Sequence, residues 1–262
     1  MCLLLLAFHV VPQRPWLLLG NRDEFHARAT AAAQPWADDP QVIGGRDLEA
    51  GGSWLALNRN GRFAAVTNVR TGKAQRGPRS RGELVSGFAR GTDTPAHYTA
   101  EIARQRDQYG PFNLVVGDRD SACGASSLRA DAWRFASGVH VLSNGPPDAA
   151  WPKIMRLRSR FDALLHSGKM EIAAADRSGA ATGDTELLDL LADTAQPADA
   201  ELPDTGVGPD LERALAPIFI RGAQYGTRAS TLAYLRDDGG TVLREHSFGP
   251  DGVDLGQSRV ET

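Results

Sequence analysis

The chain has 262 residues, of which 42% are apolar and 23% are charged, and its formal net charge is -3. This composition excludes a disordered chain and gives no sign of a surface built to bind nucleic acid. The length lies at the upper end of what one hydrophobic core organises, so we predict a single domain over residues 1–262.

The cysteines and the first residues bear on where the protein resides. With only Cys2 and Cys123, the sequence predicts no disulfide framework and favours a reducing, cytoplasmic location. The leucine run 3–6 follows no basic residue and is much shorter than the about 20 apolar residues that a bilayer requires. We therefore predict a buried strand here, and neither a secretory leader nor a transmembrane segment.

Apolar runs predict strands that come in pairs. Residues 2–8 and 16–20 read as two buried strands joined by a turn, and 53–57 with 63–67 flank Asn58-Arg59-Asn60-Gly61, a strong hairpin signal. Further along, the predicted elements are one strand at 112–117, a pair at 133–135 and 139–142, and a hairpin at 229–235 and 242–248.

Helical spacing appears between these strand pairs. Residues 82–107 predict two helices and 152–166 an amphipathic one, whereas 170–210 predict a short helix at 187–191 with loops that form a lid or a surface excursion. The glycine-rich segment 44–52 predicts a turning loop and matches no phosphate-binding pattern. This order favours antiparallel or mixed sheets covered by helices over a doubly wound nucleotide-binding fold.

Cys2 has two interpretations. Free cysteines often act as small buried hydrophobes, and one at the start of a strand fits that role. If Met1 is removed, however, Cys2 carries a free α-amino group whose ordinary pKa of about 7.7 to 8.0 lets it accept the thiol proton. The residue would then be a nucleophile with its own base.

Asn21-Arg22-Asp23-Glu24 places an amide, a cation and two carboxylates directly after a predicted buried strand. If the first two strands pair antiparallel, Arg22 and Asp23 approach Cys2. Arg22 would favour the thiolate, and Asp23 would hold the α-ammonium or orient the base. The alternative is a turn with a solvated ion pair.

With these residues in place, the chain resembles the NRDE family, also called the transport-and-Golgi-organisation family, which is named for the same tetrapeptide. The segments that carry the resemblance are Met1-Cys2, Asn21-Arg22-Asp23-Glu24-Phe25, Gly52-Ser53-Trp54, Thr67-Asn68-Val69-Arg70, Ser80-Arg81-Gly82, Leu142-Ser143-Asn144-Gly145 and Tyr225-Gly226-Thr227-Arg228. That family in turn is similar to N-terminal-nucleophile hydrolases, especially the cysteine branch with penicillin V acylase and bile-salt hydrolase. The resemblance implies an α+β fold, a four-layer αββα sandwich of antiparallel sheets.

The resemblance also implies a site that hydrolyses a linear carbon-nitrogen amide bond without a cofactor. Its catalytic residues would be Cys2 as nucleophile, Arg22, Asp23, Asn144 as oxyanion donor, and the late arginine, Arg228. On the substrate side we expect Asn21, Glu24 and Asn68.

One departure affects these roles. In the acylases the arginine and the aspartate are separated, whereas Arg22 and Asp23 are adjacent, and neighbours on a strand point to opposite faces. Either the strand ends before them, or only one of them faces Cys2 and Glu24 takes one of the roles.

A competing function is non-catalytic haem binding in the same pocket, because relatives in the resembled family are linked to haem trafficking and membrane organisation. The partners to expect are thus a small-molecule amide or haem. Cys2 itself could ligate haem iron. Trp54 is expected in the core. The scattered histidines are expected to be ordinary structural or surface residues: His9, His26, His140 and His246. No HExxH or CxxC motif indicates a metal site.

Overall fold

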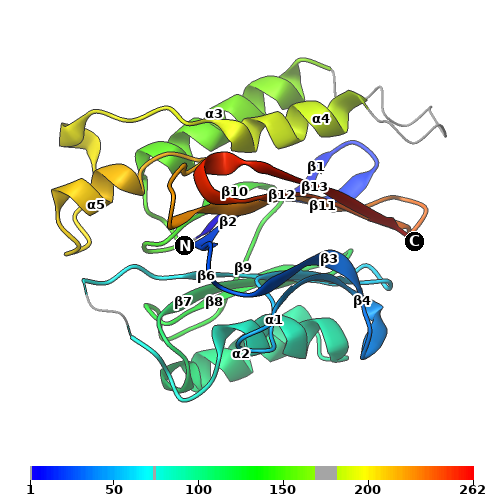
Figure 1. Cartoon of the computed structure of the whole chain (residues 1–262). Helices are drawn as coiled ribbons and strands as arrows, with labels where there is room; N and C mark the ends of the chain where they lie inside the picture. The colour runs from blue at the N-terminus through cyan, green and yellow to red at the C-terminus, as the bar shows by residue number, and fades with distance from the viewer. Residues whose placement is uncertain (1, 73–74, 169–181) are drawn as a thin grey trace.

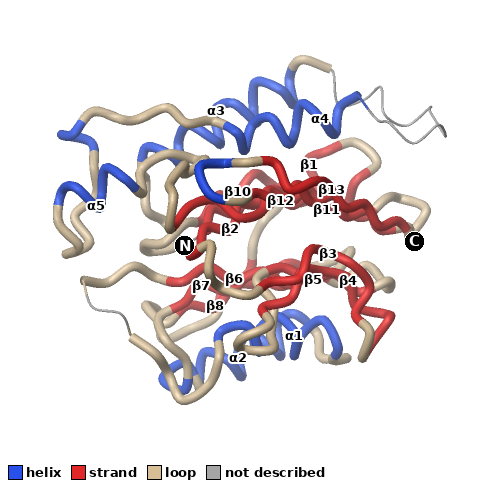
Figure 2. Tube along the Cα trace, viewed as in Figure 1, coloured by secondary structure: helices blue, strands red, loops and turns tan. Residues whose placement is uncertain are grey.

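The computed structural model describes residues 2–72, 75–168 and 182–262. Two antiparallel sheets lie face to face, and helices cover the outer face of each (Figures 1 and 2). This order of helix layer, sheet, sheet and helix layer confirms the α+β sandwich that the resemblance implied.

The six-stranded sheet has the order β10-β1-β2-β11-β12-β13 and the seven-stranded sheet runs from β3 to β9 in sequence order. The strands of the first sheet are β1 (Cys2–Val11), β2 (Arg14–Phe25), β10 (Gly138–Leu142), β11 (Tyr225–Leu235), β12 (Thr241–Phe248) and β13 (Asp254–Glu261). Those of the second are β3 (Thr30–Trp36), β4 (Asp39–Asp47), β5 (Leu55–Asn58), β6 (Phe63–Asn68), β7 (Phe112–Gly117), β8 (Ala122–Ser126) and β9 (Trp133–Arg134). The helices are α1 (Arg81–Arg90), α2 (Pro95–Arg104), α3 (Pro152–His166), α4 (Thr182–Asp189) and α5 (Pro209–Ala214).

Alternation along β1 and β2 builds two of the three apolar layers. Leu4, Leu6 and Leu18 face the seven-stranded sheet, whereas Leu5 and Leu19 face α3 and α4. Successive side chains of a strand point to opposite faces, so one apolar run serves both layers. A third layer lies between the seven-stranded sheet and helices α1 and α2.

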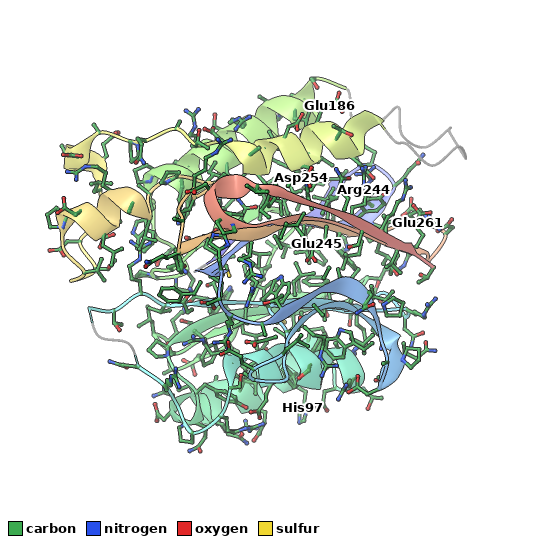
Figure 3. The ribbon with its side chains drawn as sticks, in the orientation of Figure 1. His97, Glu186, Arg244, Glu245, Asp254 and Glu261 are labelled. Atoms are coloured by element: carbon green, nitrogen blue, oxygen red, sulfur yellow. The ribbon has the colours of Figure 1, made fainter. Side chains whose placement is uncertain are left out.

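A buried carboxylate joins the two sheets. Glu245 of β12 is 2% exposed and accepts hydrogen bonds from the Ala33 backbone N of β3 at 2.8 Å and the Thr231 hydroxyl at 3.1 Å. Burial raises the pKa of its carboxyl. Its neighbour Arg244 points to the other face of the sheet (Figure 3). There Arg244 pairs with Asp184 of α4 at 3.5 Å. The strand therefore ties its sheet to both adjoining layers.

The structure confirms most of the predicted elements. The pairs β1 with β2, β5 with β6 and β11 with β12 are antiparallel neighbours, as the turn sequences indicated. Helices α1, α2 and α3 occupy the ranges where helical spacing was found. Within the described ranges, no helix combines the length and apolar content that a membrane crossing would need.

The predicted pairing of 133–135 with 139–142 is wrong. Trp133 lies in β9, which pairs with β8 in the seven-stranded sheet, whereas β10 pairs with β1 in the other sheet. The connecting residue Phe135, 7% exposed, packs in the layer between the sheets. The chain thus crosses between the two sheets here. A Ser-Gly turn in such a crossing looks the same in the sequence as the turn of a hairpin.

The glycine-rich segment 44–52 is not one loop. Gly44 and Gly45 lie inside β4, and only the later glycines belong to the turn that follows. A Cβ on Gly44 would come within 2.5 Å of the Leu55 carbonyl oxygen of β5. These glycines permit close strand packing.

The predicted lid or excursion over 170–210 is described only in part. Residues 182–210 form α4, two 3-10 turns (Leu190–Ala192 and Asp199–Glu201) and the start of α5. Residues 170–181 lie outside the described ranges.

Candidate active site

The pairing of β1 with β2 brings Arg22 to Cys2. The two residues are directly opposite in the antiparallel register, so their side chains share the face that looks toward the seven-stranded sheet. β2 continues to Phe25, so the NRDE tetrapeptide is strand and not a turn. Of the two arrangements left open by the sequence, the structure has the one in which Arg22 and Asp23 face opposite sides.

A pocket of about 440 Å³ opens beside Cys2. Its walls come from the first residue of β1, the last residues of β2, the turn after β4, and the segment 75–82 that leads into α1. The charged residues that line it are Arg22, Arg28, Arg76, Arg79 and Arg81 with Asp23, Glu24, Asp47 and Glu49.

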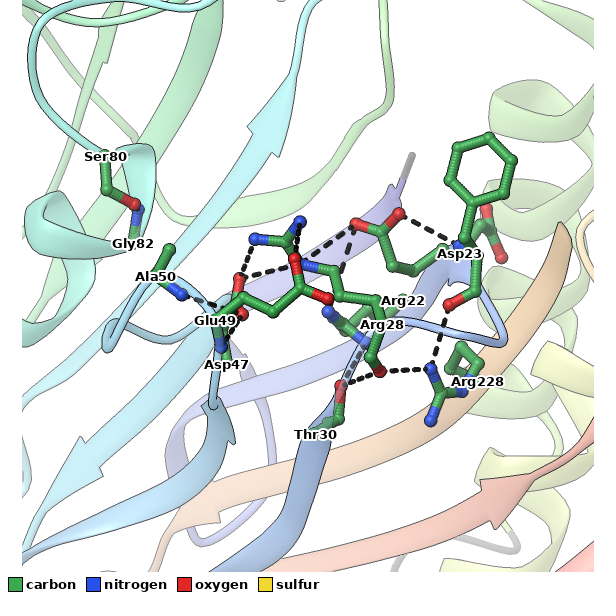
Figure 4. Close-up of polar contacts among 12 residues, drawn as sticks. Arg22, Asp23, Arg28, Thr30, Asp47, Glu49, Ala50, Ser80, Gly82 and Arg228 are labelled. Atoms are coloured by element: carbon green, nitrogen blue, oxygen red, sulfur yellow. Dashed lines mark hydrogen bonds and ion pairs between the residues drawn. The ribbon is translucent and has the colours of Figure 1, made fainter.

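Arg28 holds one wall of this pocket together (Figure 4). Its Nη2 and Nε donate to Asp47 at 2.6 and 2.9 Å, and its Nη1 lies 3.2 Å from Glu49. Glu24, at 3.9 Å, completes a group of three carboxylates around one guanidinium. The end of β2 is thereby fixed to the turn after β4, and Arg28 is fully engaged.

Arg22 is held between an aromatic ring and polar partners. The guanidinium carbon lies 4.4 Å from the centre of the Trp54 ring, Nη1 donates to the Thr30 hydroxyl at 3.2 Å, and Glu24 lies 3.9 Å away. Trp54, predicted for the core, is only partly buried and carries this cation on its face. Arg22 is therefore a positioned cation beside Cys2.

The Cys2 thiol is in an environment that opposes ionisation on balance. Burial raises its pKa, and the Asp23 charge raises it further, whereas the Arg22 charge and the Asp23 backbone N–H lower it. A reactive thiolate at neutral pH therefore needs a base beyond these groups.

Asp23 belongs to the opposite face of β2, next to the helix layer. Its Oδ1 accepts a hydrogen bond from the Thr227 hydroxyl of β11 at 2.7 Å. Burial raises the pKa of the carboxyl, while the charges of Lys153 on α3 and of Arg70 lower it. The carboxylate is near enough to Cys2 to affect the thiol, yet it does not share a face with Arg22.

Asn68 and Asn144 form an amide pair next to Cys2. Asn68 lines the pocket, whereas Asn144 is fully buried and donates its Nδ2 to the Asn68 carbonyl oxygen at 2.9 Å and to Asn68 Oδ1 at 3.2 Å. The neighbouring Ser143 hydroxyl donates to the Cys2 carbonyl oxygen at 3.2 Å. The structure thus places Asn68 at the pocket and Asn144 behind it.

Two expected site residues have their side chains engaged elsewhere. Asn21, 2% exposed, donates to the backbone carbonyls of Leu191 and Ile218 at 2.9 and 2.8 Å on the helix side of the sheet. Arg228 sits at a bulge of β11 and donates to the carbonyls of Phe25 and Arg28 at 3.0 and 2.9 Å (Figure 4). Both order the end of β2 and neither lines the pocket, while Glu24 does.

The sequence interpretation gave no role in the site to Arg81, Ser80 or Trp54, all of which line the pocket. Gly52-Ser53-Trp54 and Ser80-Arg81-Gly82 stand out as motifs in the sequence, but a motif alone does not show which groups meet. Only the stacking of the sheets brings these two segments to Cys2.

The family model described as "Transport and Golgi organisation 2" matches residues 1–250. Among its relatives, the mouse Transport and Golgi organization 2 homolog is 28% identical over 94% of this chain and 90% of the relative. The human homolog is also 28% identical, over 88% of this chain and 86% of the relative.

Solved structures give weaker likenesses. A C2A mutant of conjugated bile acid hydrolase from Clostridium perfringens matches with a TM-score of 0.48 and 8% identity over 100% of this chain and 92% of that one. A Caenorhabditis elegans N-acylethanolamine-hydrolyzing acid amidase ortholog matches with a TM-score of 0.41 and 9% identity over 88% and 92%. At these values they carry nothing about activity. By the match of its family model over nearly the whole sequence, the chain belongs to the Transport and Golgi organisation 2 family.

Proposed function

We propose that the protein is an N-terminal-nucleophile hydrolase that cleaves a linear carbon-nitrogen amide bond through Cys2 after removal of Met1. The observation that supports this most is the position of Cys2: it borders a polar pocket, opposite Arg22 and beside the Asn68–Asn144 amide pair. A purely structural cysteine would not require a cation and two amides around it.

In the proposed mechanism the freed α-amine takes the thiol proton and the Cys2 sulfur attacks the amide carbonyl carbon. The tetrahedral oxyanion is stabilised by the Asn144 amide, with Asn68 exchanging its hydrogen bonds to allow this. The carbon-nitrogen bond breaks, the amine leaves with the proton, and water hydrolyses the thioester. Asp23 holds the α-ammonium and Arg22 stabilises the thiolate.

The first test is the intact mass of untagged protein, because retained Met1 blocks the proposed base and would exclude this mechanism. Hydrolysis of a panel of N-acyl amides follows, with the Cys2→Ala variant and, as the matched control, Cys123→Ala, since Cys123 is buried away from the pocket. We expect activity to vanish in the first and persist in the second. Equal activity in both would refute the proposal.

The Asn144 assignment has its own test. Loss of one oxyanion donor costs about 2.7 to 4 kcal/mol, so Asn144→Ala should lower kcat by about 100-fold or more. Because Asn144 is fully buried, the melting temperature is measured in parallel to show that the variant is folded. A folded variant with full turnover contradicts the assignment.

Haem binding, the competing function, is checked on the same protein by absorbance near the Soret band during haem titration. Of the residues that line the pocket, Cys2 is the only one of the types that ordinarily ligate haem iron. The many charged side chains on its walls suit a polar ligand better than an apolar macrocycle. A saturable Soret shift that is lost in Cys2→Ala would favour haem binding over the proposed hydrolase function.

A further inference from the structure

Arg81 is a pocket cation that forms no ion pair with a described residue. It is the first residue of α1 and is only partly exposed, yet its guanidinium forms no ion pair with any carboxylate that the structure describes. Its one hydrogen bond to a described residue goes from Nη1 to the Pro111 carbonyl oxygen at 3.5 Å, the far limit for such a contact. Of the neighbouring pocket arginines, Arg28 is taken up by three carboxylates and Arg22 is stacked on a ring.

The place of Arg81 disfavours a positive charge on two grounds. The first turn of a helix carries a positive partial charge, which repels a cation. Burial lowers the pKa of the Arg81 guanidinium, while the charges of Cys2 and Glu24 raise it. An arginine at this position therefore receives little stabilisation from the rest of the fold. A bound anion would offset both the repulsion from the helix start and the cost of burying the charge.

The backbone that carries Arg81 is held rigidly against the pocket wall. A Cβ on Gly52 would lie 2.5 Å from the Gly82 carbonyl carbon, and the Ser53 N–H donates to the Gly82 carbonyl oxygen at 3.3 Å. The Ser80 hydroxyl accepts from the Gly82 N–H at 3.2 Å as part of a capping box (Figure 4). These contacts give a reason for the glycines and serines of both motifs. They also fix the position of the Arg81 backbone, from which the side chain extends.

We propose that Arg81 binds a carboxylate of the molecule that reacts at Cys2, so that the substrate is an amide that also bears a carboxylate. The substrate class rests on the proposed function, whereas the anion site does not. A planar guanidinium with its donors uncommitted matches a carboxylate in two parallel hydrogen bonds. Arg81 would thus orient the substrate with its amide toward Cys2.

The test compares two alkylating reagents of nearly equal size, iodoacetate and iodoacetamide. With each, the Cys2 thiolate attacks the methylene carbon, the carbon-sulfur bond forms, and iodide leaves with the electrons of the carbon-iodine bond. Only iodoacetate carries a carboxylate. The ratio of the two rates, read from the mass of the Cys2 peptide, therefore reports anion binding beside the sulfur without requiring any turnover.

We expect Arg81→Gln to lower the iodoacetate-to-iodoacetamide ratio about tenfold, in line with the loss of a charge-assisted hydrogen bond. The matched control is Arg79→Gln, an exposed arginine of the same pocket paired with Glu83 at 3.1 Å, which should keep the ratio. Removal of a cation from a helix start should not impair folding. An unchanged ratio in Arg81→Gln overturns the proposal.

Arg81→Lys gives an independent measurement, because it keeps the charge and loses the planar fork. Its ratio should lie between those of the natural protein and Arg81→Gln, and a ratio below that of Arg81→Gln would contradict the proposal. If amides are not hydrolysed but the ratio depends on Arg81, only the hydrolase proposal fails. If they are hydrolysed and the ratio is indifferent to Arg81, only the anion site fails.

Discussion

The two faces of β2 at its end carry charges of different kinds. On the face toward the seven-stranded sheet, Arg22 lies opposite Cys2 and borders the pocket. On the other face, Asp23 lies near three buried ionisable residues toward the helix layer. We call this group the buried cluster; its members are Asp23, Arg70, Lys153 and Glu212. Adjacent residues of one strand thus have their side chains on opposite faces, although Asp23 also borders the pocket and its charge acts on the Cys2 thiol.

Solvent access distinguishes the two groups. In the pocket wall the side chains of Arg28 and Glu49 are 26% and 51% exposed, so their ion pair is screened and contributes little to stability. In the buried cluster, Arg70 and Glu212 are paired at 4% and 3% exposure, so each charge depends on its partner. We infer that the pocket face serves binding and reactivity, whereas the Arg70–Glu212 pair of the buried cluster serves stability.

The largest expected effect follows Glu212→Ala. Glu212 accepts hydrogen bonds from Arg70 and from the Thr205 N–H and hydroxyl, the latter two at 2.8 and 2.6 Å. Its removal breaks a buried ion pair by taking away one partner, which costs about 3–5 kcal/mol. Urea denaturation should show this as a lower midpoint.

The matched substitution in the pocket is Glu49→Ala, which removes a partner of Arg28 while two carboxylates remain. We expect a loss of less than about 1 kcal/mol. Comparable losses in the two variants would show that solvent access does not separate the two faces.

Lys153 gives the stability of the buried cluster a pH dependence. The side chain is 4% exposed, and burial lowers its pKa from the ordinary 10.5 to about 8. Between these values the native lysine is neutral while the unfolded chain still binds the proton, so stability rises with pH across this window. The rise amounts to about 3 kcal/mol.

In Lys153→Met this rise should be absent when urea denaturation is repeated between pH 8 and 10.5. The control is Arg156→Met on the same helix, whose side chain is 52% exposed and which should keep the rise. If the natural protein and Lys153→Met show parallel pH profiles, Lys153 is not a buried titrating group.

The fold was predictable where a strand carries a continuous apolar run, and position in the sheet did not decide it. The edge strands β9 and β10 were predicted as strands, whereas the inner strands β4 and β8 were missed. Apolar runs and the turn between them identified β1 and β2, which lie inside the six-stranded sheet. The edge strands β3 and β13 were missed. β3 reads Thr-Ala-Ala-Ala-Gln-Pro-Trp, with alanine and proline of low strand propensity, and β13 is largely exposed. Neither strand carries a continuous run of strand-forming residues, so its pattern is weak.

The site was predictable as far as strand geometry reaches. The antiparallel pairing put Arg22 beside Cys2, and alternation indicated that Arg22 and Asp23 could not both face Cys2 if the strand continued through them. The contacts between Asn144 and Asn68, and the approach of Arg81 to the pocket, depend on how the two sheets stack. The spacing of residues along the sequence does not predict how the sheets pack, so these contacts could be identified only from the structure.

The smallest expected effect concerns Arg22 itself. Because its charge lowers the Cys2 pKa, Arg22→Met should raise that pKa further and reduce the thiolate present at pH 8. Alkylation of Cys2 by neutral iodoacetamide should then slow by about three- to tenfold. Arg228→Met is the control, since that guanidinium contacts backbone carbonyls and does not line the pocket. If both variants slow alkylation equally, the effect comes from general disorder at the end of β2. A lower alkylation rate in Arg22→Met alone assigns the charge that favours the thiolate to Arg22 on the pocket face.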